Sequence, residues 1–392
     1  MSITLDLLTK TSPNAFYVFD IPKLRARIGF LKSRLPSHVS LCYAVKANTF
    51  VIREIADVVD RFEICSPGEE HICEKLGVPA GQMVISGVYK TPEFIEKLIS
   101  SHDPDRVYTV ESLNQFDLIR NLSEKAGCSV PVLLRLTNDS QFGINREDIE
   151  NIVKNREEYK SLELRGIQFF SGTQKTSVKK LAREIRHLDE FLCSLRDNFG
   201  YSAPELEYGT GFPVSYFSES EDNENELLDG FAEFISSMSF KTKIVIELGR
   251  SIAASCGRYF TRVVDLKCNK GQNYAIVDGG MHHIVYFGQH MAMWHPLMSL
   301  WGNEGEPEAE YNICGSLCSM NDVIVKSAPL PELSVGDMLC FENVGAYSMT
   351  EGISLFLSRD IPAIYFSDGD DELHLVRSAF QTAPLNTPNY EI

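Results

Sequence analysis

The stretch VSLCYAVKAN (39–48) indicates how the chain folds, because a short apolar run leads directly into a lysine. Runs of this kind are typical of strands that are buried on both faces, as in parallel sheets. Longer amphipathic stretches such as SVKKLAREIRHLDEFLCSL (177–195) alternate with them. This alternation predicts parallel βα units, and eight units close a (β/α)8 barrel. The predicted strands are 39–45, 62–65, 83–86, 106–110, 131–136, 164–170, 204–209 and 243–248.

The character of the sequence changes after Arg250. Short β-rich pieces separated by turn residues replace the long amphipathic stretches, which predicts a second, β-rich domain. The segment FYVFD (16–20) is expected to pair with that domain. We therefore expect an α/β protein with an N-terminal (β/α)8 TIM barrel over 21–249 and a C-terminal β-rich domain over 250–392, to which 1–20 also belongs.

Composition excludes several kinds of partner. The formal net charge of -17 disfavours nucleic acid and anionic membranes, because both would repel the chain. The ten cysteines show no CxxC pair or zinc-type spacing with histidine, so neither a metal site nor a disulfide framework is expected. No apolar run approaches the ~18 residues of a membrane span, and no secretory apolar segment is seen near Met1. These features predict a cytoplasmic protein.

The ends of the predicted strands carry residues suited to one chemistry. Barrel enzymes place their reactive groups at the carboxyl ends of the strands. Glycine turns there let backbone N–H groups approach a phosphate, and a lysine in a drier barrel mouth can lose its proton and form a Schiff base. Taken singly, such a lysine is usually a surface residue and Gly-x-Gly is usually a turn. The residues at these ends are Lys46, Glu63, Ser66, Arg135, 170–173, 209–211, Glu247, Gly249 and Arg250.

Seven motifs in the same order resemble a known family. YAVKAN (43–48) resembles the Schiff-base lysine motif of the fold-type III pyridoxal-phosphate decarboxylases, which include ornithine and diaminopimelate decarboxylases and share the alanine racemase-like barrel. No single match is specific to the family, but the occurrence of all seven in the same order over residues 16–378 is specific to it. The other six segments are CSPGEE (65–70), GIQFFSGTQ (166–174), EYGTGF (207–212), ELGR (247–250), GSLCSMND (315–322) and NVGAY (343–347).

The resemblance implies a role for each matching residue. Lys46 would hold pyridoxal 5'-phosphate as an internal aldimine, and Glu247 would pair with the pyridine nitrogen and make the ring an electron sink. Cys318 would return a proton after carbon dioxide leaves. In the family this cysteine comes from the partner subunit, so a homodimer with two shared sites is implied. The further cofactor contacts implied are Glu63, Arg135, Phe170, Thr173, Gly209, Gly211, Gly249, Arg250 and Tyr347.

Three departures from the family bear on the substrate. Phe170 stands where the family has a ring-stacking histidine, and it can stack but cannot donate a hydrogen bond. Ser319 replaces the acid that usually binds the distal amine of the substrate, and a hydroxyl holds an ammonium far less well. The segment 281–290 lacks the arginine of diaminopimelate decarboxylases. Ser319 and Asp322 are the expected substrate contacts, and the pattern resembles the branch that acts on amino acids tethered to acyl carrier proteins.

Three other functions stay open from the sequence. Because Asp322 is present, a decarboxylase of free ornithine, lysine or diaminopimelate is one. A racemase of the same fold is another, although alanine racemases place an arginine at the pyridine nitrogen, where this chain has Glu247, and continue their lysine motif differently from Thr49 onward. A non-catalytic binding homologue is the third. Such a protein would be free to lose Lys46 or Cys318, and this chain has both.

Two charged segments lie outside the motifs. The helix predicted after the sixth strand places Lys179, Arg183 and Arg186 on one face, with Lys175 and Lys180 nearby. This face could steer an acidic carrier protein, or it could be an ordinary solvated surface. The run SESEDNENE (218–226) predicts a solvated flexible loop, with an active-site lid as the alternative.

Overall fold

The computed structural model describes residues 3–303, 305–369 and 372–389, and the chain divides into two compact units. The first, here the barrel unit, consists of Arg27–Pro213 and Asn223–Ile252. The second, here the sheet unit, consists of the described residues of Met1–Ala26, Val214–Asp222 and Ala253–Ile392. Helix α2 (Ile21–Arg34) spans a boundary between the two.

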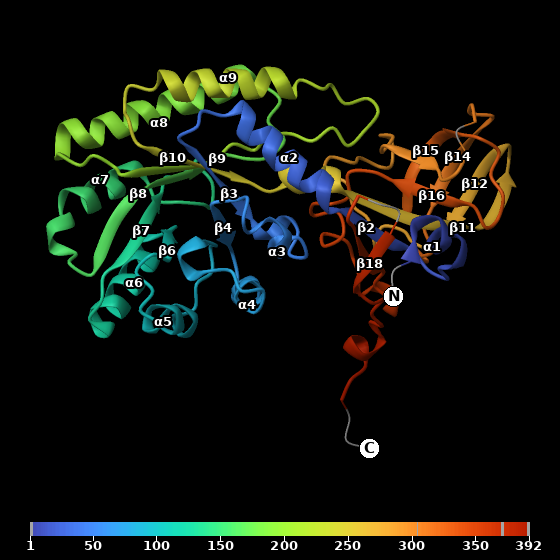
Figure 1. The fold of residues 1–392 in the computed structure, drawn as a ribbon, viewed down its shortest axis with the longest axis horizontal. Helices are drawn as coiled ribbons and strands as arrows, with labels where there is room; N and C mark the ends of the chain where they lie inside the picture. Colours follow the sequence, from blue (N-terminus) through green and yellow to red (C-terminus); the bar gives the residue numbers. More distant parts are fainter. Residues whose placement is uncertain (1–2, 304, 370–371, 390–392) are drawn as a thin grey trace. The chain divides into compact units, whose positions relative to one another are not determined.

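The barrel unit contains a closed barrel of eight parallel strands in the order β10-β3-β4-β5-β6-β7-β8-β9 (Figure 1). Each strand falls on one of the eight apolar runs, so the predicted (β/α)8 barrel is confirmed. The runs read as nearly continuous apolar segments because helices cover the outer face of the strands and side chains fill the interior. The strands are β3 (Val39–Ala44), β4 (Arg61–Ile64), β5 (Met83–Ile85), β6 (Val107–Val110), β7 (Val130–Arg135), β8 (Leu162–Phe170), β9 (Glu205–Gly209) and β10 (Lys243–Leu248).

The barrel helices begin and end where the sequence offers caps. In α8 the apolar side chains recur every three or four residues and are buried, and the helix stops at Gly200, which adopts a left-handed φ of 64°. Hydroxyl caps that accept a backbone N–H, each worth ~1 kcal/mol, precede four helices at Ser66, Thr91, Ser112 and Ser177. The helices are α3 (Ile52–Ile55), α4 (Pro67–Lys75), α5 (Pro92–Ser100), α6 (Leu113–Ala126), α7 (Arg146–Lys154), α8 (Val178–Phe199), α9 (Glu224–Ser237) and α10 (Arg250–Ala253).

The interior of the barrel is layered. An apolar cluster from five strands fills its middle, formed by Cys42, Val84, Val107, Leu133 and Val245. Buried acids and cations also line the interior, on β4, β9 and β10. The barrel is therefore a packed core rather than a pore, and its polar side chains must find partners within it.

The sheet unit is built on a mixed ten-stranded sheet, which confirms the predicted β-rich domain. Its main order is β1-β18-β17-β2-β11-β12-β14-β15, with β16 paired to β11 and β13. Strand β2 pairs antiparallel with β11 and parallel with β17, which ties 16–20 into this sheet. The elements are β1 (Ile3–Thr4), α1 (Leu5–Thr11), β2 (Phe16–Asp20), β11 (Gly257–Asn269), β12 (Gln272–Val277), β13 (Met298–Leu300), β14 (Ala309–Cys314), β15 (Val323–Leu330), β16 (Met338–Phe341), β17 (Ala363–Ser367) and β18 (Glu372–Arg377).

The acidic run 218–226 is not the uniform flexible loop that its composition predicts. Its last three residues begin helix α9, where Glu224 pairs with Arg27. Earlier in the run, Glu219 pairs with His295 at 2.5 Å. Paired acids lose the solvation on which the prediction relied, so composition alone misjudged the segment. Within the described ranges, no helix is long and apolar enough to cross a membrane.

Candidate active site

Lys46 and Glu63 form an ion pair at the carboxyl ends of adjacent strands. Lys46 lies in a short 3-10 turn just after β3, and its Nζ is 2.6 Å from Glu63 Oε2 on β4. Cys65 Sγ lies 3.4 Å from the same Nζ. Burial works to raise the pKa of Glu63, but the charge and hydrogen bond of Lys46 bring that pKa below its usual range. Glu63 is therefore a carboxylate that holds the Lys46 amine in a fixed place at the barrel mouth.

Glu247 is a buried acid balanced between its charged and neutral forms. It lies on β10, and Gln168 on β8 donates to its Oε1 at 2.9 Å. Burial and the nearby Glu63 raise the pKa of Glu247, while hydrogen bonds from Glu207 and Gln168 and the charge of Lys46 lower it. Such an acid can be ionised by a cationic partner, which is what a protonated ring nitrogen would be.

Two glycine-bearing turns pack backbone against backbone next to these residues. Gly211 has a φ of 64°, and a β-carbon there would lie 2.1 Å from the carbonyl oxygen of Gly172. A β-carbon at Gly209 would lie 2.4 Å from the ring of Phe170, so that ring occupies the space above the turn. The buried hydroxyl of Thr210 has no partner among the described residues. Side chains longer than glycine would close this cradle, and a phosphate approached by backbone N–H groups fits it.

Arg250 and Thr173 border the same cradle. Arg250 follows Gly249 at the end of β10 and is buried, and its Nε lies 3.4 Å from Thr173 Oγ1. A buried guanidinium beside glycine turns supplies the positive charge that a phosphate requires. The structure thus brings together the predicted barrel residues Lys46, Glu63, Phe170, Thr173, Gly209, Gly211, Glu247, Gly249 and Arg250 at the carboxyl ends of the strands.

Arg135 belongs to a buried network that the sequence analysis missed. Its Nη1 lies 2.9 Å from Glu111 Oε2, and its guanidinium stacks over Phe142 at 4.8 Å. Lys90, also buried, donates to Gly87 O at 2.6 Å and to Gln115 at 3.2 Å, and burial lowers its pKa to about 8. Glu111 follows the fourth barrel strand, so reading the strand ends without a gap would have found it. Lys90 lies in a loop and gave no such signal.

Ser66, singled out at the end of the second strand, has a structural task. Its hydroxyl caps α4 by accepting from Glu69 N at 3.2 Å, and Glu69 accepts from Cys65 N at 2.6 Å. This reciprocal arrangement resembles a capping box. The CSPGEE motif therefore fixes the start of a helix directly beyond Glu63, and with it the backbone of Cys65, whose Sγ lies 3.4 Å from Lys46 Nζ.

In the sheet unit, Cys318 lies on an exposed loop between β14 and β15. The loop is held from beneath by Asp322, which is buried and accepts from Met281 N at 2.7 Å and from Leu317 N at 2.8 Å. Gly280 and Gly315 are required here, because a β-carbon at either would fall within 2.6 Å of the Asp322 carboxylate. Both oxygens of Asp322 are thus engaged by backbone, and its expected contact with substrate stays a prediction.

Ser319 and Tyr347 also belong to the sheet unit. The hydroxyl of Ser319 accepts from Asn321 N at 3.2 Å, which closes a turn directly after Cys318. Tyr347 has a left-handed φ of 63°, a conformation rare for a bulky side chain, and its carbonyl accepts from the N–H groups of Thr350 and Glu351. Strain of this kind persists where the surroundings fix the backbone, and it is common at ligand sites.

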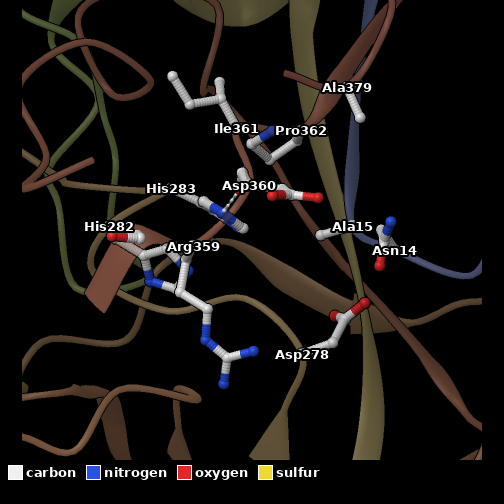
Figure 2. Close-up of a pocket in the computed structure, with 11 residues that line it drawn as sticks. Asn14, Ala15, Asp278, His282, His283, Arg359, Asp360, Ile361, Pro362 and Ala379 are labelled. Carbon is white, nitrogen blue, oxygen red and sulfur yellow. Dashed lines mark hydrogen bonds between the residues drawn. The ribbon is translucent and has the colours of Figure 1, made fainter. Parts of the chain in front are cut away.

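A polar cavity of about 250 Å³ lies in the same unit (Figure 2). In the wall of this cavity, His283 Nε2 forms a hydrogen bond of 2.9 Å with the carbonyl oxygen of Asp360. Arg359 lines the cavity and donates to Ser316 O at 2.9 Å, and the hydroxyl of Ser316 donates to Asp278 O at 3.0 Å. The backbone of the Cys318 loop is therefore tied to two further segments of the sheet unit.

An eight-stranded parallel barrel with a lysine, a balanced acid and a glycine cradle at its mouth, followed by a β-rich unit, defines a pyridoxal-phosphate enzyme of the alanine racemase-like fold class. The family model for the pyridoxal-dependent decarboxylases, whose description names their C-terminal sheet domain, matches residues 16–345. The chain belongs to this family, whose members are lyases that use pyridoxal phosphate.

Curated relatives cover most of the chain. It is 25% identical over 386 residues to the L-glutamyl-[BtrI acyl-carrier protein] decarboxylase of Niallia circulans, covering 91% of this chain and 89% of the relative. It is 24% identical over 363 residues to the diaminopimelate decarboxylase of Aquifex aeolicus, covering 88% and 84%. Decarboxylation of an amino-acid substrate is common to both relatives, whereas the form of the substrate differs.

Solved structures agree in fold. Diaminopimelate decarboxylase of M. jannaschii in complex with L-lysine superposes with a TM-score of 0.86 at 22% identity, covering 97% of this chain and 92% of that one. Lysine/ornithine decarboxylase of Vibrio vulnificus in complex with cadaverine gives 0.80 at 22% identity, covering 93% and 96%. At this identity the likeness establishes the architecture but not the substrate, which has to be inferred from the residues of the site.

Proposed function

We propose that this decarboxylase removes the α-carboxylate of an amino acid presented by an acidic carrier protein. The observation that carries the proposal is a basic surface on α8, next to the glycine cradle of the barrel. The assignment of residues to cofactor and substrate, and the dimer that completes the site, are parts of the same proposal.

The barrel residues would hold pyridoxal phosphate by three kinds of contact. Lys46 Nζ is the point of covalent attachment, since its amine is fixed by Glu63. The turns at Gly209 and Gly211, with Arg250, receive the phosphate, and Glu247 receives the ring nitrogen. When bound, the cofactor withdraws electrons from the α-carbon of the substrate, so that the bond to the carboxylate can break.

Glu247 supports this chemistry by staying charged. In its ionised form it stabilises a proton on the ring nitrogen, which strengthens electron withdrawal. Glu63 would keep the Lys46 amine at the barrel mouth, because the two side chains form an ion pair at 2.6 Å. Phe170 offers an aromatic face but no proton, so proton transfer falls to other groups.

Cys318 is the group we assign to the last proton transfer. It lies on an exposed loop, so its thiol is accessible to a substrate bound by another subunit. We place it in the site of a partner subunit, so that the working enzyme is a homodimer with two shared sites. This assembly is the arrangement that the family resemblance implies.

The loop that bears Cys318 offers little to a distal ammonium. Ser319 is neutral, and its hydroxyl already accepts a backbone N–H. Both oxygens of Asp322 accept backbone N–H groups, and the residue is buried, so its carboxylate is poorly accessible to a substrate amine. A substrate whose distal end is neutral or tethered suits this loop better than lysine, ornithine or diaminopimelate.

The basic surface of α8 is formed by Lys179, Lys180, Arg183 and Arg186. All four side chains are exposed, and none forms an ion pair with another described residue of the chain. Lys175, expected beside them, is not part of this surface, because it is buried and pairs with Glu184 at 2.7 Å. Four unpaired cations on a chain of net charge -17 form a local attraction for an acidic protein.

This surface lies at the cofactor end of the barrel. The N–H of Lys175 donates to Gly211 O at 2.9 Å, and α8 begins three residues later at Val178. An acidic partner docked on the first two turns of α8 would therefore hold its tethered substrate close to the glycine cradle. The carrier-dependent relative from Niallia circulans supports this reading of the partner.

The test compares free and tethered substrates. Carbon dioxide release is measured with L-glutamate, L-ornithine, L-lysine and diaminopimelate, and with L-glutamyl groups loaded on an acyl carrier protein. We expect turnover of the tethered substrate only. Efficient turnover of a free diamino acid, with no gain on tethering, would contradict the proposal.

Charge reversal then tests the surface. The double variant Lys179→Glu/Arg183→Glu should lower kcat/KM for the tethered substrate by about 10- to 100-fold at low salt, and the loss should shrink as salt screens the charges. Lys154→Glu/Lys160→Glu is the matched control, since both lysines are exposed and unpaired among the described residues. Lys154 ends α7 and Lys160 precedes β8, so both lie at the amino ends of the barrel strands, opposite the glycine cradle. Equal losses in the two double variants would exclude α8 as the docking surface.

A further inference from the structure

A column of polar side chains runs through the barrel interior beneath Glu247 and ends at Lys243, which is exposed. At its lower end Lys243 Nζ lies 3.1 Å from Glu205 Oε2, and Arg61 makes two bonds to the same carboxylate. Glu207 lies two residues beyond Glu205 on β9 and is completely buried. Arg61 Nη1 is 3.4 Å from Glu207 Oε2, a longer contact than either of its bonds to Glu205.

The top of the column is a contact between two acids. Glu207 on β9 and Glu247 on β10 lie two residues apart in the register of adjacent parallel strands, and Gln168 on β8, which is in register with Glu207, donates to Glu247 Oε1. Two neighbouring carboxyls buried in this way disfavour each other's ionised form, so one of the two carries a proton. No N–H or hydroxyl of the described residues donates to Glu207 Oε1. A buried oxygen without a donor is costly for an ionised acid, whereas a protonated acid becomes the donor itself.

Three observations place the proton on Glu207 rather than on Glu247. Glu207 is the more deeply buried, and the neighbouring Glu205 and Glu247 are both acidic. Arg61 is largely committed to Glu205. Glu247, in contrast, accepts from Gln168 at 2.9 Å, and an accepted hydrogen bond favours the ionised form. The other titratable groups around the pair are Glu63, Lys46 and Cys42.

We propose that Glu207 is a positioning residue that carries a proton at neutral pH and donates it in a hydrogen bond to Glu247, which keeps Glu247 ionised for the cofactor ring. The roles of Lys46 and Glu247 in this statement rest on the proposed function. The proton on Glu207 does not, because it follows from the buried carboxyl pair alone.

The polar column would then control the charge of Glu247. Glu247 has a pKa near 7, because burial and the charge of Glu63 raise it while the Glu207 hydrogen bond lowers it. Without that donor, Glu247 would take up a proton at higher pH and would lose its attraction for a protonated ring nitrogen. Since a buried acid of raised pKa binds its proton more tightly in the folded protein, ionising Glu247 costs stability as the pH rises toward its pKa.

The first test is an infrared measurement on the apoprotein. We expect the carbonyl stretch of a protonated, buried carboxylic acid to persist above the pKa of Glu247, which is about 7, and we expect Glu207→Gln to remove it there. Isotope labelling of glutamate identifies the band as glutamyl. If the band is absent from the apoprotein, or survives in Glu207→Gln, the proposal is overturned. This test needs neither cofactor nor substrate, so its outcome is separate from that of the carrier proposal.

The second test measures the affinity of the apoprotein for pyridoxal phosphate as the pH is varied around neutrality. In Glu207→Leu the midpoint of the pH dependence should rise by about one pH unit, because the donor is lost. Glu207→Gln keeps an N–H donor and should leave the midpoint near that of the parent. Val245→Ala is the control for packing damage, since Val245 lies beside Glu207 in the sheet register and carries no proton.

Two outcomes of the second test would overturn the proposal. One is equal midpoints for Glu207→Leu and Glu207→Gln. The other is a shift in Val245→Ala as large as that in Glu207→Leu, which would trace the effect to packing. If Glu207→Leu does not fold, the comparison of Glu207→Gln with the parent decides: a midpoint raised by a full pH unit would contradict the donor role.

Discussion

The barrel mouth and the Cys318 loop hold reactive groups in opposite ways. At the barrel mouth each acid that we assign to the cofactor is buried, and its pKa is shifted by named neighbours, by Lys46 for Glu63 and by Glu63, Glu207 and Gln168 for Glu247. On the loop, Cys318 is exposed and only the backbone beneath it is fixed, by the buried carboxylate of Asp322.

The difference follows from what each region must do. Charges that tune a ring need low dielectric surroundings and fixed partners, because water would screen them. A thiol that meets a substrate brought by another molecule must be accessible, so only its backbone can be preorganised. Substitutions at the barrel mouth should therefore change cofactor chemistry, and substitutions in the loop should change turnover while leaving the cofactor in place.

The largest effect is expected at Lys46. Lys46→Ala should lose the covalently bound cofactor and cut turnover by several orders of magnitude, because the covalent route is removed. Absorption spectra and carbon dioxide release measure the two effects. Lys90→Met is the matched control for removing a buried amine near the site, and it should retain the covalent cofactor. Loss of the cofactor band in Lys90→Met, with the band kept in Lys46→Ala, would reverse the assignment.

Cys318 comes next. Cys318→Ala should bind the cofactor normally but turn over about 10²-fold or more slowly, the range typical of a lost proton donor. Mixing it with Lys46→Ala should restore about a quarter of the parent sites, since half of a randomly exchanged C2 dimer population is mixed and each mixed dimer has one intact site. No recovery after proven subunit exchange would mean that each subunit builds its own site.

A smaller effect is expected at Asp322. Asp322→Asn replaces one acceptor by an amide that cannot accept, so one of two charged bonds to Met281 and Leu317 is lost, worth about 2 kcal/mol of stability. We expect a lowered Tm and a fall in kcat of about tenfold, with unchanged affinity for pyridoxal phosphate. Asp265→Asn, at an exposed position of the same sheet, should lower neither Tm nor kcat. A selective loss of cofactor in Asp322→Asn would break the contrast between the regions.

The barrel could be predicted from the sequence because its strands are buried on both faces and appear as isolated apolar runs. Residues at strand ends, such as Glu63 and Glu247, were found by the same reasoning. Glu207 was not, because it lies inside a strand where an apolar residue is the ordinary expectation. Only the three-dimensional positions of Glu247 and Arg61, each on another strand, explain why an acid is tolerated there.

Charge pattern was a less reliable guide. The face of Lys179 and Arg183 is exposed as predicted, whereas Lys175 is buried against Glu184. The acidic run 218–226 was expected to be a loop, yet Glu224 lies in the first turn of α9 and is paired with Arg27. Sequence shows the sign of each charge but not the partner that neutralises it, and partners distant in sequence decided both cases.

The central claim is that the amine of Lys46, fixed by Glu63, holds the cofactor. Lys90 is its natural rival, because it is a second lysine near the barrel mouth and burial lowers its pKa to about 8. Borohydride reduction of the holoenzyme, followed by peptide mass mapping, distinguishes the two directly. We predict the reduced phosphopyridoxyl group on the peptide that contains Lys46. Its presence on the peptide that contains Lys90, or on no lysine at all, would contradict the account.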